Sequence, residues 1–143
     1  MDYCYAPDPI SEGEFRIIHV SNPFMCMENQ GGSTASFTKL VMAPCNDSKR
    51  NQFFKLTADK RLRTVVDTNV CVEMDPNDAW GVFLHSACLD SWSWQIDNNG
   101  TYYIKNDGDK LCLGLENATS ITNEDKVHRF PCDVSNALFT FLW

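Results

Sequence analysis

Six of the seven cysteines in this 143-residue chain recur in phase, and this recurrence limits the folds that the chain can adopt. The leading cysteines of three segments are spaced by 45 and 41 residues, at Cys26, Cys71 and Cys112. The trailing cysteines are spaced by 43 and 44 residues, at Cys45, Cys88 and Cys132. An aromatic residue closes each segment, at Phe54, Trp94 and Phe139. Because three separate markers keep the same period, we predict three copies of one structural unit.

Each unit has the pattern of short β-strands. Residues 14–20, 69–74, 100–106 and 110–116 are alternating, β-branched or aromatic, and turn sequences rich in Gly, Asn and Asp separate the strands. About four strands in each unit favour an all-β closed barrel, because closure deals with unpaired strand edges. We expect an N-terminal extension over residues 1–13 and a single domain over 14–143, with repeats at about 14–57, 58–99 and 100–143.

The recurrence also selects a disulfide pairing. Among the many pairings open to six cysteines, the repeat favours one bridge within each unit: Cys26 with Cys45, Cys71 with Cys88, and Cys112 with Cys132. Each bridge would close a loop of about 20 residues and stabilise the fold by roughly 3 kcal/mol. Cys4 is left over, as a free thiol, a cross-link to another chain or the partner of a segment outside this sequence.

Charge and motif content argue against several functions. The net charge of −7 predicts no nucleic-acid partner, and no apolar run approaches the ~18 residues that membrane insertion needs. Neither Cys-x-x-Cys nor a Cys/His cluster at zinc spacing occurs, so we expect no metal and no cofactor. The histidines have no nucleophile or acid partner at motif spacing, so we expect no enzyme activity.

N-glycosylation sequons together with paired cysteines are typical of proteins of the secretory pathway. Glycosylation acceptors of the type Asn-x-Ser/Thr occur at Asn46, Asn99 and Asn117. The first fifteen residues have neither the basic start nor the apolar run of a signal peptide. We therefore expect a secreted, extracellular or lumenal domain whose targeting signal is not in this sequence.

These elements together resemble the ricin-B-type β-trefoil lectins. Each unit reads Cys-apolar-acid, then an apolar strand ending in Cys, then a closing element that is Gln-x-Trp in that family. The closing elements here are Gln52-Phe53-Phe54, Trp92-Ser93-Trp94 and Ala137-Leu138-Phe139, so only the first keeps the glutamine. Within the family, the chain is most similar to the cysteine-rich domains of mannose-receptor-family receptors and to the lectin domains of polypeptide GalNAc-transferases. The resemblance implies a β-trefoil fold with one sugar site in each repeat.

The family pattern implies three parts for a sugar site. A carboxylate two residues after the first cysteine accepts hydrogen bonds from sugar hydroxyls, and an aromatic two residues before the second cysteine stacks on the sugar ring. An asparagine before the closing element adds a polar contact. A site that lacks either the carboxylate or the aromatic should bind weakly, because a sugar has both an apolar face and a polar rim.

No repeat carries all three parts. The acid, stacking and asparagine positions hold Glu28, Ala43 and Asn51 in repeat one, where Gln52 follows, and Glu73, Ser86 and Ser91 in repeat two. In repeat three they hold Gly114, Phe130 and Asn136, with His128 and Glu116 nearby. We expect the best carbohydrate site in repeat three (Phe130, Asn136, His128 and Glu116) and the second in repeat one (Glu28, Asn51 and Gln52).

The same residues can also be interpreted as structural rather than sugar-binding. Glu28 and Glu73 would instead be solvated strand residues, and Asn51 and Gln52 would satisfy backbone groups in the turn. Phe130 would belong to a hairpin core rather than face a sugar.

The favoured function is non-catalytic binding of a terminal sugar such as galactose or GalNAc, with a glycan or glycoprotein as partner. One alternative is a protein-interaction trefoil with degenerate sugar sites, docking a protein or pairing through Cys4. The other is a regulatory lectin domain of a glycosyltransferase.

Overall fold

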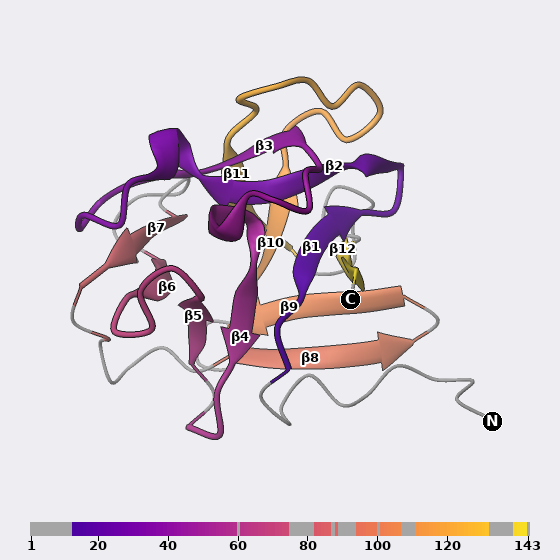
Figure 1. The fold of residues 1–143 in the computed structure, drawn as a ribbon. Helices are drawn as coiled ribbons and strands as arrows, with labels where there is room; N and C mark the ends of the chain where they lie inside the picture. The colour runs from indigo at the N-terminus through magenta and orange to yellow at the C-terminus, as the bar shows by residue number, and fades with distance from the viewer. Residues whose placement is uncertain are drawn as a thin grey trace, which may run out of the picture.

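The computed structural model describes residues 13–59, 61–74, 82–86, 88, 94–99, 101–106, 111–131 and 139–142. Twelve strands account for most of its regular structure (Figure 1). They are β1 (Arg16–His19), β2 (Asn22–Asn29), β3 (Leu40–Pro44), β4 (Phe54–Leu56), β5 (Leu62–Thr64), β6 (Cys71–Met74), β7 (Val82–His85), β8 (Trp94–Asn99), β9 (Thr101–Asn106), β10 (Leu111–Leu115), β11 (Val127–Pro131) and β12 (Phe139–Leu142). Two short 3-10 helices, η2 (Gln30–Gly32) and η3 (Arg50–Gln52), lie in loops. The predicted all-β fold is confirmed.

Three four-stranded antiparallel sheets each combine strands of two repeats. Their orders are β12-β1-β2-β3, β4-β5-β6-β7 and β11-β10-β9-β8. The first strand therefore pairs with the last, with Arg16 opposite Leu142 and His19 opposite Phe139. The backbones of Phe15 and Phe54 exchange hydrogen bonds of 3.0 and 2.8 Å, which joins two of the sheets. This closed threefold arrangement is a β-trefoil.

The core repeats with the same threefold pattern. The residue after each leading cysteine is fully buried, at Met27, Val72 and Leu113. Three phenylalanines are fully buried as well, at Phe15, Phe54 and Phe139. Alternate residues of a strand face opposite sides, so one side of each hairpin supplies the core and the other side is available for a site. Phe54, the aromatic that closes the first segment, is therefore a core residue.

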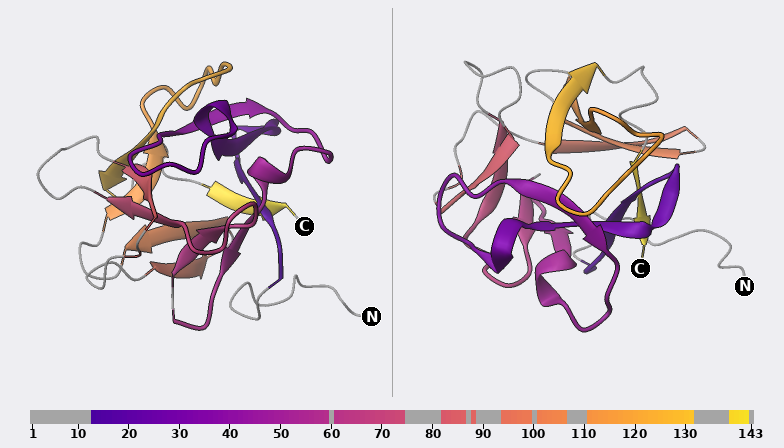
Figure 2. Two further views of the ribbon diagram at one scale, coloured as in Figure 1. Left: turned by 60° about the vertical axis from the view of Figure 1, so that its left-hand side comes forward. Right: turned by 90° about the horizontal axis from the view of Figure 1, so that it is seen from above.

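Three hairpins (β2–β3, β6–β7 and β10–β11) lie close together on one side of the fold, as the two views in Figure 2 show. Backbone hydrogen bonds join one hairpin to the next, from Leu84 N to Thr38 O (2.8 Å) and from Met42 N to Asp125 O (2.8 Å). The β2–β3 loop of repeat one therefore lies against β7 of repeat two, and the β10–β11 loop of repeat three lies against β3 of repeat one.

Disulfides tie the hairpins as the repeat predicts. Cys26 is bonded to Cys45 and Cys71 to Cys88, with Cα atoms 4.9 and 5.3 Å apart. Cys112 is also disulfide-bonded, while Cys132 lies outside the described residues. Two of the three predicted bridges are confirmed. Cys4 lies outside the described part as well.

In the described residues, no helix has the length and apolarity that crossing a membrane requires. Nor do these residues hold a group of three or more His, Cys, Asp or Glu side chains arranged for a metal ion.

Candidate functional site

The outer face of the β10–β11 hairpin carries two aromatic rings of repeat three, those of His128 and Phe130. In its register, Phe130 lies opposite Cys112 and His128 lies opposite Gly114. Directly opposed residues share a face, and so do residues two apart in a strand. The two rings meet edge to face with centroids 6.4 Å apart, and both side chains are partly exposed. Phe130 is therefore placed on the outer face, away from the buried Leu113 and Val127.

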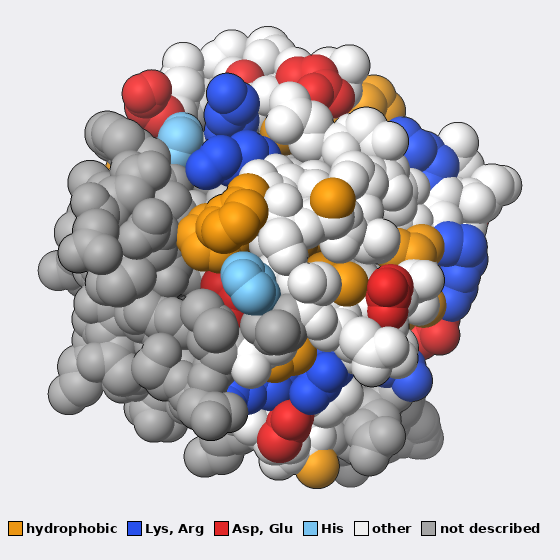
Figure 3. Space-filling model, turned by 90° about the vertical axis from the view of Figure 1, so that its left-hand side faces the viewer, with side chains coloured by type: hydrophobic (Ala, Val, Ile, Leu, Met, Phe, Trp, Pro, Cys, Tyr) orange, Lys and Arg blue, Asp and Glu red, His pale blue; other side chains and the backbone are white. Residues whose placement is uncertain are grey.

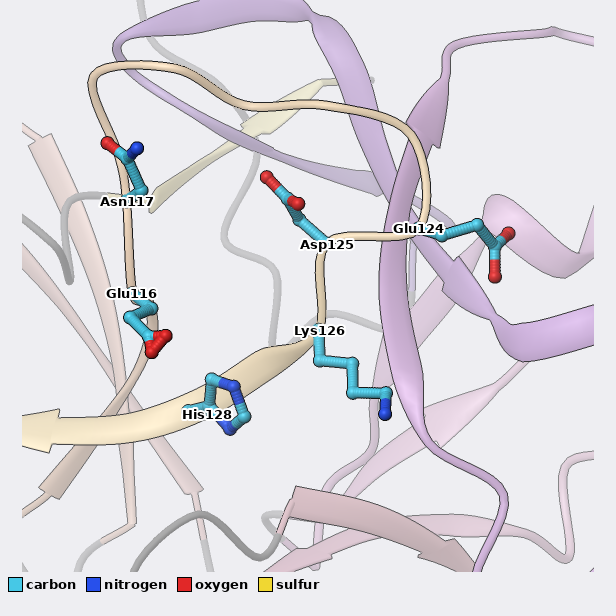
Figure 4. A pocket seen from close by; sticks show the side chains of 6 residues that line it. All are labelled: Glu116, Asn117, Glu124, Asp125, Lys126 and His128. Carbon is cyan, nitrogen blue, oxygen red and sulfur yellow. The ribbon is translucent and has the colours of Figure 1, made fainter.

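A hollow of about 290 Å³ lies beside this face (Figure 4). Its lining consists of Glu116, Asn117, Glu124, Asp125, Lys126 and His128. Gly114 has no side chain to offer opposite His128, and Glu116 follows two residues later, just beyond the end of β10. Figure 4 shows the Glu116 carboxylate directed toward the His128 ring. The structure thus brings Glu116 and His128 together, as the sequence predicts.

The loop around the hollow is held by its own polar contacts. The Asp125 carboxylate accepts hydrogen bonds from the amide and the hydroxyl of Thr122, both 2.8 Å long. Glu124 has a backbone φ of 71°, and its amide donates to Met42 O of repeat one (2.7 Å). Asp125 therefore shapes the loop, and Glu116 is the carboxylate that lies beside the His128 ring.

Repeat one holds its acid differently. Glu28 is only 4% exposed, so its interpretation as a solvated strand residue is wrong. Its Oε1 accepts a hydrogen bond from Gln52 Nε2 (2.8 Å) and lies 2.9 Å from Lys49 Nζ. Ala43, opposite Cys26, offers no ring for stacking. The carboxylate that would bind sugar hydroxyls is already engaged by two groups of the protein.

The amides of repeat one serve the backbone. Gln52 is fully buried; its Oε1 accepts from Asn46 N (2.9 Å) and its Nε2 also donates to Pro44 O (2.9 Å). Asn51 Nδ2 lies 3.5 Å from Asn29 O. The structural interpretation of both amides is confirmed, and Gln52 connects the buried acid to the turn after β3.

The register of repeat two corrects the position expected for stacking. His85, not Ser86, lies opposite Cys71, and Phe83 lies opposite Glu73. The physical reason is one extra residue between β7 and Cys88: the equivalent position is two residues before the trailing cysteine in repeats one and three, and three before it here. Glu73 is fully buried, so its interpretation as a solvated residue is also wrong.

An aromatic cluster between repeats one and two is absent from the sequence prediction. Phe37, in the loop before β3, packs on Phe83 and His85 with ring centroids 5.2 and 5.6 Å apart, yet it is 67% exposed. Figure 3 shows hydrophobic side chains exposed on this face next to a histidine. The partners of Phe37 belong to the next repeat, so motif spacing within a repeat gives no signal for this cluster.

Two expected residues cannot be placed. Asn136 lies outside the described residues, as does Ser91. The observed candidate site therefore consists of Glu116 and His128, which line the hollow, and Phe130, whose ring lies against His128.

The profile of the ricin-type beta-trefoil lectin domain family matches residues 14–141 of the chain. No sequence among the curated proteins matches it significantly. The family assignment thus comes from the pattern of the whole domain.

Solved structures agree with this fold. The Rhizoctonia solani agglutinin is 19% identical with a TM-score of 0.75, over 96% of this chain and 99% of that one. The C-half of the earthworm R-type lectin, in complex with GalNAc, is 12% identical with a TM-score of 0.70, over 90% and 97%. A non-toxic type II RIP homologue from Momordica charantia, in complex with α-methyl-D-galactoside, is 18% identical with a TM-score of 0.71, over 92% of this chain and 48% of that chain.

Proposed function

Because the chain belongs to the family of ricin-type β-trefoil lectin domains, we propose that it binds a terminal sugar such as galactose or GalNAc through repeat three. One observation carries this proposal: Glu116 and His128 line one hollow, and the Phe130 ring lies against His128 on the same face. This is the combination that a pyranose needs, with an aromatic surface for its apolar face and polar groups for its hydroxyls.

The mechanism is reversible binding without bond cleavage. The Phe130 ring packs on the apolar face of the sugar, the Glu116 carboxylate accepts hydrogen bonds from hydroxyls, and the His128 ring donates or accepts at the edge. Three carboxylates and one ammonium line the hollow, so it favours neutral sugars over anionic ones. A single shallow site binds weakly, and multiple copies on one partner would supply avidity.

Repeat one ranks second because the acid that it would use is held by Gln52 and Lys49. The same proposal includes a secreted or lumenal location, supported by the disulfides and the sequons. Its partner is a glycan or a glycoprotein.

The test is binding to an array of oligosaccharides ending in galactose, GalNAc and other sugars. Phe130→Ala should weaken binding at least tenfold. Phe24→Ala is the matched control, because Phe24 is 78% exposed on β2 of repeat one, outside the hollow. Equal losses in the two variants would contradict the proposed site. If the chain without an attached N-glycan bound no oligosaccharide, carbohydrate binding itself would be refuted.

One observation favours a second candidate function, docking of a protein. The exposed Phe37 ring, supported by Phe83 and His85, is an apolar surface of the kind that protein partners cover. A photo-crosslinking residue placed at position 37 should then capture a single extracellular protein, whereas the same residue at position 24 should not. Equal capture at both positions would contradict this candidate.

A further inference from the structure

One of the three sequons lies on the rim of the hollow in repeat three. Asn117 follows Glu116 directly and lines the hollow with it, and Figure 4 shows its amide above Glu116, directed away from the Glu116 carboxylate. It is exposed, in a surface turn between β10 and β11. Sequon and candidate site are thus adjacent in space, not only in sequence.

The local geometry suits modification of this asparagine. The hydroxyl of Thr119, the third residue of the sequon, donates a hydrogen bond of 3.0 Å to Asn117 Oδ1. Both side chains are exposed, so an enzyme can reach them from solvent. The amide nitrogen, which has to become the nucleophile, takes no part in this bond.

A second sequon with a different local role is available for comparison. Asn46 is exposed too, but its Oδ1 accepts from Ser48 N (2.9 Å) and its backbone N–H donates to Gln52 Oε1 (2.9 Å). It belongs to the turn of repeat one and does not line the hollow. A glycan on Asn46 would therefore leave the hollow open.

We propose that Asn117 is an N-glycosylation site whose glycan covers the hollow of repeat three and controls access to it. In the transfer, Asn117 Nδ2 bonds to C1 of the first N-acetylglucosamine of a lipid-linked diphosphate oligosaccharide. Nδ2 loses one proton, and the lipid diphosphate leaves. The bulky product begins one residue from Glu116, so it lies over the carboxylate and the His128 ring.

The proposed effect of the glycan on sugar binding rests on the proposed function. The presence of a glycan on Asn117 and its covering of the hollow do not. The experiment therefore needs a readout of access that requires no sugar ligand. His128 supplies one, because diethyl pyrocarbonate modifies accessible imidazoles. His85 is also partly exposed, lies outside the hollow and serves as the internal reference.

The chain would be secreted from cultured animal cells behind an added leader, with Asn46→Gln and Asn99→Gln leaving one sequon. Thr119→Val in the same background removes that sequon and keeps Asn117 itself. Peptide mass mapping measures occupancy. With the glycan present, labelling of His128 relative to His85 should be at least threefold slower than in the Thr119→Val protein. Binding to immobilised oligosaccharides ending in galactose or GalNAc should be at least tenfold weaker.

An unmodified Asn117 in the secreted protein would overturn the inference. So would an occupied Asn117 with His128 labelled at the same rate as in the Thr119→Val protein. Failure of the proposed function looks different: the Thr119→Val protein would bind no oligosaccharide, while occupancy and slower labelling of His128 would still support the covering glycan.

Discussion

Phe37 combines a strained backbone with an exposed ring, and substitutions can separate the two. Its φ is 72°, in the left-handed region that residues with a side chain avoid. Two hydrogen bonds hold the loop in this conformation, from Phe37 N to Leu84 O (2.7 Å) and from Leu84 N to Thr38 O (2.8 Å). We therefore expect the backbone to stay left-handed when the side chain is replaced.

Phe37→Ala and Phe37→Gly both remove the ring contacts with Phe83 and His85, so this loss cancels when the two variants are compared. What remains is the cost of the left-handed conformation for alanine, roughly 1–2 kcal/mol, less the roughly 0.5–1 kcal/mol of extra backbone entropy that glycine loses on folding, a net of about 1 kcal/mol in favour of glycine. Phe37→Gly should be the more stable variant by this amount. With a urea slope of roughly 2 kcal/mol per molar, the unfolding midpoints should differ by about 0.5 M.

Phe24 supplies the matched control pair. It is exposed on β2, and among the described non-glycine residues only Phe37 and Glu124 have a positive φ. In a strand, glycine is less stable than alanine by about 0.5–1 kcal/mol, so Phe24→Gly should be less stable than Phe24→Ala. Urea unfolding followed by tryptophan fluorescence gives all four midpoints. The same sign at both positions would refute the reasoning.

Two further predictions concern repeat one and the turn before β5. Gln52→Ala should destabilise the fold by about 3 kcal/mol in urea unfolding, because it removes the hydrogen bonds of Gln52 with Glu28, Pro44 O and Asn46 N. Asn51→Ala should cost less than about 1 kcal/mol, and similar costs for the two variants would contradict the role assigned to Gln52. Burial raises the pKa of Asp59, but hydrogen bonds from Thr57 and Arg63 and the guanidinium charge outweigh it and hold the pKa below its ordinary value. The carboxylate therefore contributes stability above the unfolded-state pKa of about 3.9 and loses it as the pH falls through the lower folded value. Above about pH 5, Asp59→Asn should be less stable than the unsubstituted chain, by less than about 1 kcal/mol because the Asp59 side chain is 54% exposed. This difference in the free energy of unfolding should disappear toward about pH 2. A difference that does not change with pH would contradict the assignment.

Features that follow from the spacing of residues along the chain can be predicted from the sequence. The period of the cysteines predicts the bridges Cys26–Cys45 and Cys71–Cys88, because a bridge that closes one hairpin repeats with the hairpin. Alternation predicts the strands, since one side of each hairpin must supply the core. Likewise, the pattern of repeat three correctly brings Glu116 and His128 to one hollow.

Features that depend on register or on another repeat escape the sequence. Counting back from Cys88 leads to Ser86, whereas hydrogen-bond pairing places His85 opposite Cys71. The burial of Glu28 depends on Lys49, 21 positions away in the chain, folding back over it. The packing of Phe37 requires knowing that the loop of repeat one lies on β7 of repeat two. None of these contacts has a signature in local spacing.

The sharing of strands between neighbouring repeats has a consequence for smaller versions of this protein. In a peptide that contained a single repeat, the fourth strand would belong to the sheet of the next copy. The other three strands would lack the strand that the preceding repeat supplies. Such a peptide has no way to complete its own sheet, but three copies, each lending a strand to the next, would complete all three. A lone repeat of this chain should consequently be found as a closed trimer or not folded.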